Sequence, residues 1–181
     1  MNSKEKAAIF IDGGYLNQVL KNNFGAKDVN YLKLSEMLCE NCSVNRLRTY
    51  FYHCLPLVRK GNMQDVKRQA SMERFLAKLR RFPRFEIKLG KLQIIGGQFK
   101  QKMVDVLMSL DIVEMCIENK IQHAIIIAGD SDFIPAIRKA KNAGAIVHLF
   151  YHPKSIHQQI LDEVDELHEI NEELIRKILQ D

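Results

Sequence analysis

Hydrophobic residues occur along the chain in short uninterrupted runs, and longer segments with helical spacing separate these runs. The first run, Ala7 to Ile11, is apolar throughout and ends at Asp12, as expected of a strand that is buried on both faces and closed by a turn. Runs rich in β-branched and aromatic residues predict further strands at 47–55, 85–89, 125–128 and 146–151. Strands that alternate with helices imply right-handed crossovers. The pattern therefore predicts an α/β fold, a three-layer Rossmann-like sandwich with a mostly parallel sheet.

The segments between these runs predict helices and one hairpin. A helix is expected from about Tyr15 to Asn23, and Leu92 to Phe99, interrupted by two glycines, suggests a hairpin arm. A further helix, before the strand at 85–89, has an apolar stripe formed by Met72, Phe75, Leu76 and Leu79. The same helix has a basic stripe formed by Lys67, Arg74, Lys78 and Arg81. We expect one domain over residues 1–181, with an acidic helical extension from about residue 155.

The charge of the chain is distributed unevenly. The formal net charge is only +5, but residues 59–102 contain 13 Lys and Arg against 3 Asp and Glu, counted from the sequence. The remainder then holds 14 basic and 19 acidic residues (27 − 13 and 22 − 3). Such asymmetry indicates an anionic partner for the middle of the chain, although a solvated helix surface would give the same pattern.

Targeting and membrane signals are missing from the sequence. No N-terminal stretch combines a basic region, an apolar run and a small-residue cleavage site, and no run of roughly 20 uncharged apolar residues occurs. We therefore expect a cytoplasmic protein that does not enter a membrane.

The four cysteines favour ordinary reduced thiols. Cys39 and Cys42 have the C-x-x-C spacing of zinc or redox pairs, but Cys54 and Cys116 do not supply a second pair at a usual spacing. The six histidines include His152 and His157 just beyond the last predicted strand, where a turn and a packed helix are the favoured interpretation.

Carboxylates follow the predicted strands at the same edge of the sheet. Asp12 follows the first strand, Asp130 and Asp132 follow the strand at 125–128, and Asp105 opens the preceding helix. Ligands of such sheets bind beyond the carboxyl ends of the strands. Each Asp alone would be read as a helix cap. Together they form an acidic cluster whose hard oxygen atoms suit Mg²⁺ or Mn²⁺.

Other observations narrow the chemistry. Asp111 falls on an apolar helix face, where an unpaired carboxylate is costly, so it is expected to have a buried partner or to support the cluster from behind. Neither a dinucleotide-binding glycine motif nor a phosphate-binding P-loop occurs. A haloacid-dehalogenase-type phosphatase would need a second carboxylate where Gly14 stands.

Three sequence blocks resemble the NYN-domain family, particularly its bacterial LabA-like branch, which shares the PIN-like fold. The blocks are Phe10-Ile11-Asp12-Gly13-Gly14-Tyr15-Leu16, Lys102-Met103-Val104-Asp105-Val106 with the later Asp111, and Ile127-Ala128-Gly129-Asp130-Ser131-Asp132-Phe133-Ile134-Pro135. The resemblance implies a metal-dependent ribonuclease that acts on RNA, single-stranded in our expectation. It also implies that Asp12, Asp105, Asp130 and Asp132 hold Mg²⁺ or Mn²⁺. PIN-like domains often pair, so a homodimer is a further expectation by analogy.

The resemblance also suggests auxiliary residues. Many NYN domains have Asn three residues after the first Asp, where this chain has Tyr15, and Asn17 is the expected substitute. Lys102 is expected to steady a phosphate oxygen and Ser131 to donate a hydrogen bond. The basic stripe is expected to bind RNA. Two alternatives stay open, namely a nucleic-acid-binding or regulatory protein without turnover, and a phosphohydrolase of small phosphate esters.

Overall fold

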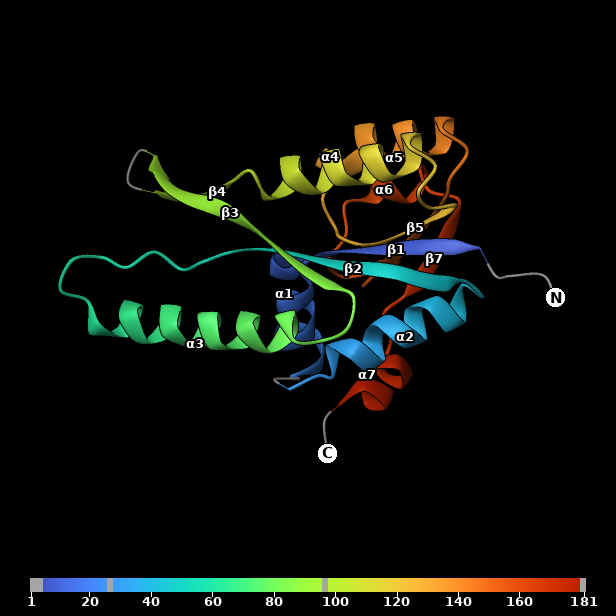
Figure 1. The fold of residues 1–181 in the computed structure, drawn as a ribbon. Coiled ribbons are helices and arrows are strands. Elements are labelled where there is room, and N and C mark those ends of the chain that lie inside the picture. Colours follow the sequence, from blue (N-terminus) through green and yellow to red (C-terminus); the bar gives the residue numbers. More distant parts are fainter. Residues whose placement is uncertain (1–4, 26–27, 96–97, 180–181) are drawn as a thin grey trace.

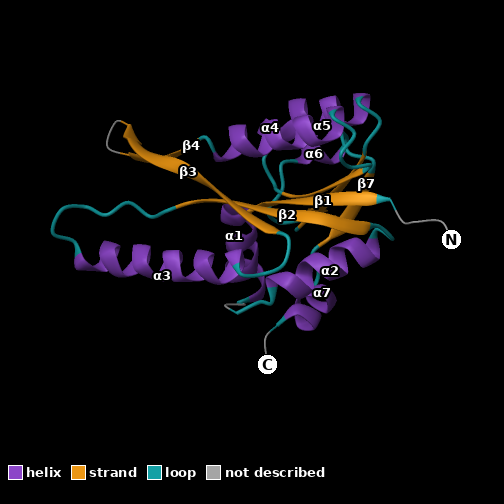
Figure 2. Ribbon diagram, viewed as in Figure 1, coloured by secondary structure: helices purple, strands orange, loops and turns teal. Residues whose placement is uncertain are grey.

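The computed structural model describes residues 5–25, 28–95 and 98–179, and the side chains of 91–102 lie outside this description. Its sheet has the strand order β4-β3-β2-β1-β5-β6-β7. Six strands are parallel, and β4 pairs antiparallel with β3 at one edge (Figures 1 and 2). The predicted α/β sandwich with a mostly parallel sheet is confirmed.

The strands match the apolar runs of the sequence. In β1, Ala7 to Ile11 are all fully buried, and every residue of β5 is buried. Side chains on both faces of these strands are therefore buried, as expected for a parallel sheet that is covered on two sides. The strands span β1 Lys6–Asp12, β2 Asn45–Cys54, β3 Phe85–Ile95, β4 Gln98–Lys102, β5 His123–Ile127, β6 Ile146–Tyr151 and β7 Glu166–Glu169.

Helices cover both faces of the sheet. Helices α1, α2, α3 and α7 lie on one face, and α4, α5 and α6 lie on the other (Figure 1). Their bounds are α1 Gly13–Phe24, α2 Tyr31–Asn41, α3 Met63–Arg80, α4 Val104–Ile117, α5 Ile134–Asn142, α6 Gln158–Leu161 and α7 Glu172–Ile178, with a 3₁₀ turn η1 at Ser131–Phe133. Across the described residues, every helix is too short or too polar to span a membrane.

The two predicted local features of the middle of the chain are present. Strands β3 and β4 pair as a hairpin, with Ile95 opposite Gln98, and the turn at 96–97 lies outside the described residues. In α3, Leu76 and Leu79 are buried, whereas the four residues of the basic stripe are exposed. Both α3 and the β3–β4 hairpin extend to the left in Figure 1, beyond the end of β1.

The expected helical extension from residue 155 needs a correction. It contains β7, which pairs in parallel with β6, between the short helices α6 and α7. Ile170 and Ile178 are buried in the core, so this segment completes the sheet and one helical layer. The strand has only four residues, Glu-Leu-His-Glu, which is typical of a short charged edge strand and gives no apolar run to detect.

Candidate functional site

The topology creates an opening between β1 and β5. The chain proceeds from β1 to β2 and β3 on one side and then returns to β5 on the other side of β1. Loops at the carboxyl ends of β1 and β5 therefore diverge, which is where ligands bind in open α/β sheets. The acidic residues predicted from the sequence lie around this opening between β1 and β5.

Asp12 ends β1 and also caps α1. Its Oδ1 accepts hydrogen bonds from the backbone nitrogens of Gly14 (2.9 Å) and Tyr15 (3.1 Å). Among the described residues its Oδ2 has no hydrogen-bond partner. The capping role and a ligand-binding role are therefore compatible, because each uses a different oxygen.

Asp130 repeats this arrangement after β5. Its Oδ1 accepts a hydrogen bond from the backbone nitrogen of Asp132 (3.2 Å) at the start of η1. Phe133, at the end of η1, is fully buried and anchors the turn in the core. The Gly-Asp-Ser-Asp-Phe block thus combines a strand end, a cap and a hydrophobic anchor, which holds Asp130 at the edge of the sheet.

Asp105 reaches the same place from the first turn of α4. Met103, the residue before α4, has a left-handed backbone (φ 79°), and no side chain makes a capping hydrogen bond there, so Asp105 makes no such bond. Asp12, Asp105 and Asp130 all line one open cavity of about 630 Å³. Asp132 is exposed and is not among the lining residues, although its charge acts on Asp105.

The remaining lining residues come from α1 and from the loop after β6. Gln18 lines the cavity from α1, and Lys154 and His157 line it from the loop. Sequence reasoning did not single out Gln18 or Lys154. Both could have been found, since Lys154 follows the end of β6 and Gln18 lies one helical turn after Tyr15 and Gly14.

Burial and neighbouring charges raise the pKa values of two of the carboxylates, Asp12 and Asp105. Burial, partly offset by the two backbone hydrogen bonds, raises the pKa of Asp12 to about 6, and the charges of Asp105 and Asp130 add to the rise. Burial and the charges of Asp130 and Asp132 also raise the pKa of Asp105. A bound cation would relieve both effects.

The donor atoms fit a hydrated hard cation. Within the described part of the chain, no three of these carboxylates bring oxygens within 4.8 Å of one another. Mg²⁺ retains several waters and takes only one or two carboxylates directly, with phosphate oxygens completing its shell. The cavity therefore suits a divalent cation bound partly through water.

Two glycines allow the loops around the cavity to approach closely. A Cβ atom added to Gly129 would lie 2.3 Å from Cε2 of Tyr15, and one added to Gly13 would lie 2.5 Å from the Phe51 ring. The Tyr15 hydroxyl accepts a hydrogen bond from the backbone nitrogen of His152 (3.0 Å). Tyr15 therefore ties α1 to the loops after β5 and β6.

The auxiliary residues lie in different places. Asn17 faces away from the acidic cavity, accepts a hydrogen bond from the Tyr31 hydroxyl (3.1 Å) and lines a second cavity of about 530 Å³ between α1 and α3. Ser131 lies in η1 and does not line the acidic cavity. The side chain of Lys102 lies outside the described residues.

Asp111 has the partners that its apolar surroundings require. Its Oδ2 accepts a hydrogen bond from the Tyr52 hydroxyl (2.7 Å) and lies 3.4 Å from Nζ of Lys88. These bonds join α4 to β2 and β3. Asp111 does not line the acidic cavity.

Comparisons with known proteins extend over most of the chain. A family model for the NYN domain matches residues 6–171. The uncharacterized protein y4oD of Sinorhizobium fredii is 38% identical over 69 residues, which are 38% of this chain and 32% of that protein. A crystal structure of VPA0982, a protein of unknown function from Vibrio parahaemolyticus, superposes with a TM-score of 0.69 and 19% identity over 99% of both chains, which shows a shared fold. The extent of the family match shows that the chain belongs to the NYN-domain family of nuclease-like proteins.

Proposed function

We propose that this NYN domain is a divalent-metal-dependent ribonuclease that hydrolyses phosphodiester bonds of single-stranded RNA. One observation carries the proposal. Asp12, Asp105 and Asp130 arrive from three separate elements and line a single open cavity, where burial and repulsion raise the pKa values of Asp12 and Asp105. Such a cluster is unfavourable without a counter-ion, which indicates a cation-binding role.

The chain's own residues divide the work of the site. Asp12 and Asp130 each use Oδ1 to hold a backbone turn and also line the cavity, while Asp105 makes no capping bond. Lys154 provides a positive charge for the substrate phosphate, and Gln18 provides an amide at the position that we had assigned to Asn17. When bound, Mg²⁺ or Mn²⁺ would supply Lewis acidity and a water of lowered pKa.

RNA would extend from the acidic cavity toward α3. The cavity between α1 and α3 is lined by Tyr31, Met72 and Phe75 together with the cations Lys21 and Arg68. Aromatic and apolar surfaces stack with exposed bases, and cations neutralise phosphates. Helix α1 contributes to both cavities, so one strand can contact both.

A second candidate is a nucleic-acid-binding or regulatory protein that does not turn over its ligand. Tyr15 stands where many family members have Asn, and its hydroxyl is bound to the backbone of His152. The site therefore lacks the usual amide at this position, and activity depends on whether Gln18 replaces it.

A cleavage assay separates these candidates. Purified protein is incubated with single-stranded RNA and with a chromogenic phosphate ester, in Mn²⁺, Mg²⁺ or chelator, beside Asp130→Asn and the matched exposed control Asp162→Asn. The ribonuclease proposal expects cleavage of RNA that needs metal and is lost in Asp130→Asn alone. RNA binding without cleavage would favour the second candidate, and hydrolysis of the ester without RNA cleavage would indicate a phosphohydrolase.

A further inference from the structure

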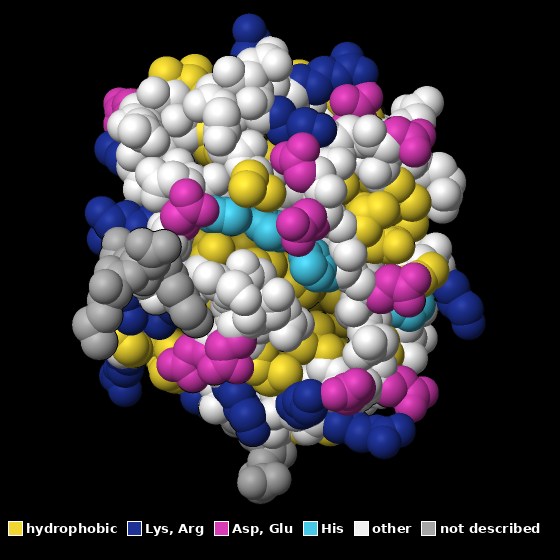
Figure 3. All heavy atoms as spheres, turned by 90° about the vertical axis from the view of Figure 1, so that its right-hand side faces the viewer, with side chains coloured by type: hydrophobic (Ala, Val, Ile, Leu, Met, Phe, Trp, Pro, Cys, Tyr) yellow, Lys and Arg dark blue, Asp and Glu magenta, His cyan; other side chains and the backbone are white. Residues whose placement is uncertain are grey.

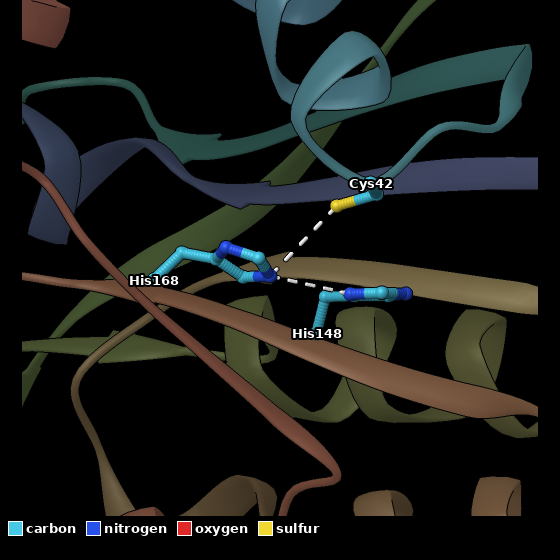
Figure 4. A group of neighbouring side chains, drawn as sticks. All are labelled: Cys42, His148 and His168. Atoms are coloured by element: carbon cyan, nitrogen blue, oxygen red, sulfur yellow. Dashed lines mark hydrogen bonds between the residues drawn. The ribbon is translucent and has the colours of Figure 1, made fainter.

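A second group of metal-binding side chains lies far from the acidic cavity, toward the amino ends of the strands. Cys42 follows the end of α2, His148 belongs to β6 and His168 belongs to β7 (Figure 4). The ring of His168 stacks on Phe150 with centroids 4.4 Å apart, so packing fixes its orientation. Figure 3 shows histidine side chains in a row on this side of the molecule, with carboxylates beside them.

The spacing of the donor atoms matches a single tetrahedral ion. Sγ of Cys42 lies 3.9 Å from Nε2 of His168, which lies 3.3 Å from Nδ1 of His148, and the three atoms are all within 4.8 Å of one another. Zinc bonds of about 2.3 Å to sulfur and about 2.05 Å to nitrogen give tetrahedral edges of about 3.6 Å and about 3.4 Å. The observed separations are close to these edges.

Glu166 lies beside two of the three donor atoms, and its side chain is half exposed. It is not part of the group whose donor atoms all lie within 4.8 Å, so it would supply a fourth donor, an oxygen, by turning toward Cys42. Its Oε2 lies 3.3 Å from Nδ1 of His148 and 3.7 Å from Nε2 of His168. A thiolate, two imidazoles and a carboxylate form a donor set that zinc accepts. The soft sulfur distinguishes this set from the all-oxygen cavity at the other end of the sheet.

A chain of hydrogen bonds defines which nitrogen of His148 carries a hydrogen. Nε2 of His123 lies 2.8 Å from a carboxylate oxygen of Glu5 and donates to it. A neutral His123 then has a bare Nδ1, which accepts from Nε2 of His148 at 2.9 Å. Nδ1 of His148 is therefore left with a lone pair that faces the cluster.

This arrangement makes two acceptors face each other. The bare nitrogen of His148 and the carboxylate of Glu166 are 3.3 Å apart, and neither supplies a hydrogen to the other. A positive charge between them resolves the conflict.

We propose that Cys42, His148 and His168, with Glu166 as the fourth ligand, bind a zinc-class divalent transition metal. The ion would fasten the end of α2 to the edge strand β7 and its neighbour β6. The His123–Glu5 pair would orient the ligand His148 through its other ring nitrogen. Cys39 has the C-x-x-C spacing to Cys42 but is buried in the core and does not belong to the cluster. The proposed site therefore contains one cysteine of the C-x-x-C pair, Cys42, together with two histidines from strands.

Titration with Co²⁺ tests this site without interference from the acidic cavity. Co²⁺ bound to a thiolate has a charge-transfer band that carboxylate-bound Co²⁺ lacks. We expect one such ion per chain in the wild type, no band in Cys42→Ser, and a Kd at least tenfold higher in His168→Phe, which keeps a ring against Phe150. His123→Gln should keep the band and raise Kd roughly 10- to 100-fold. The controls Cys116→Ser and Asp130→Asn should behave as the wild type.

A second measurement needs no variant. Cys42 is partly exposed, whereas Cys39, Cys54 and Cys116 are buried. Zn²⁺ should therefore protect Cys42 from alkylation, followed by peptide mass spectrometry, and Mg²⁺ should not. The proposal is overturned by a wild type without a thiolate band, by a band that survives in Cys42→Ser, or by alkylation of Cys42 that is equally fast with saturating Zn²⁺.

Discussion

The two ends of the parallel sheet present donor atoms in different ways. At the carboxyl ends, Asp12, Asp105 and Asp130 project from loops and first helical turns, and their oxygens stay too far apart to meet at one point. At the amino ends, His148 and His168 project from neighbouring hydrogen-bonded strands, and their nitrogens lie 3.3 Å apart. Side chains fixed by a strand ladder can be held at direct ligand distance, whereas loop carboxylates that repel one another favour an ion with its own waters.

The difference also separates two kinds of task. An open acidic cavity with retained water can accept a phosphate oxygen as an additional ligand, which suits turnover of a substrate. A compact thiolate and imidazole site, closed by a fourth protein ligand, suits a structural ion.

The largest effect is expected from Asp105→Asn. Asp105 makes no capping bond, so the change removes a charge from the cavity and leaves the helix start intact. Loss of several kcal/mol of transition-state stabilisation should slow metal-dependent RNA cleavage roughly 100- to 1000-fold. Cleavage at the wild-type rate, measured beside Asp162→Asn, would place catalysis outside this cavity.

The two sites should respond to different metals in a crossed pattern. At about 100 times its Kd, an ion adds about 2.7 kcal/mol, which should raise Tm by roughly 5 to 10 °C. The rise in Tm with Zn²⁺ should disappear in Cys42→Ser and remain in Asp130→Asn. The rise in Tm with Mn²⁺ should disappear in Asp130→Asn and remain in Cys42→Ser. If the Zn²⁺ shift were instead lost only in Asp130→Asn, zinc would belong to the acidic cavity and the comparison would fail.

Asp12→Asn should stabilise the metal-free protein at neutral pH. The pKa of Asp12 is raised from 3.8 to about 6, so between these values the folded state binds more protons than the unfolded state. The free energy of unfolding therefore falls as pH rises through this window and stays lower above it. Asn keeps the cap without the charge, and we expect a gain of roughly 1 to 3 kcal/mol at pH 7.

Urea unfolding in chelator at pH 4.5 and 7.5 measures this effect. The variant should show a smaller drop in stability between the two pH values than the wild type. A variant less stable than the wild type at pH 7.5 would mean that the hydrogen bonds of the carboxylate outweigh its burial and repulsion.

The sequence predicts the acidic edge better than the histidine cluster for a physical reason. Asp12 and Asp130 directly follow strands whose apolar runs are unmistakable, so their common edge follows from topology alone. His148 and His168 lie inside strands, and they come into contact only because β7 pairs with β6. Strand β7 has four residues, two of them Glu, and the sequence pattern predicts a helix there. The sequence singled out Cys42 as part of a C-x-x-C pair with Cys39. Its neighbour in the cluster is His168, which is 126 residues away in the sequence.

The choice between Asn17 and Gln18 could have been made from helical spacing. Asn17 and Gln18 are adjacent in α1, and helical rotation sends Asn17 toward Tyr31 and α3 while Gln18 enters the acidic cavity. Gln18 lies three residues after Tyr15 and four after Gly14, so it shares their helical face, whereas Asn17 points roughly 100° away from Gln18.

The smallest effect is expected from the basic stripe of α3. Lys67, Arg74, Lys78 and Arg81 are exposed, and none of them forms an ion pair with a described residue. Changing all four to Gln should weaken binding of single-stranded RNA about tenfold and reduce its salt slope by up to about 3, since each phosphate contact contributes about 0.7. The free energy of unfolding should hardly change.

The matched control changes four exposed cations elsewhere, Lys33, Lys139, Arg176 and Lys177, and alters the net charge equally. An equal loss of RNA affinity in both variants would show that binding depends only on the net charge of the protein. A loss confined to the α3 variant would place RNA on α3, and an unchanged slope in both would remove α3 from the RNA path.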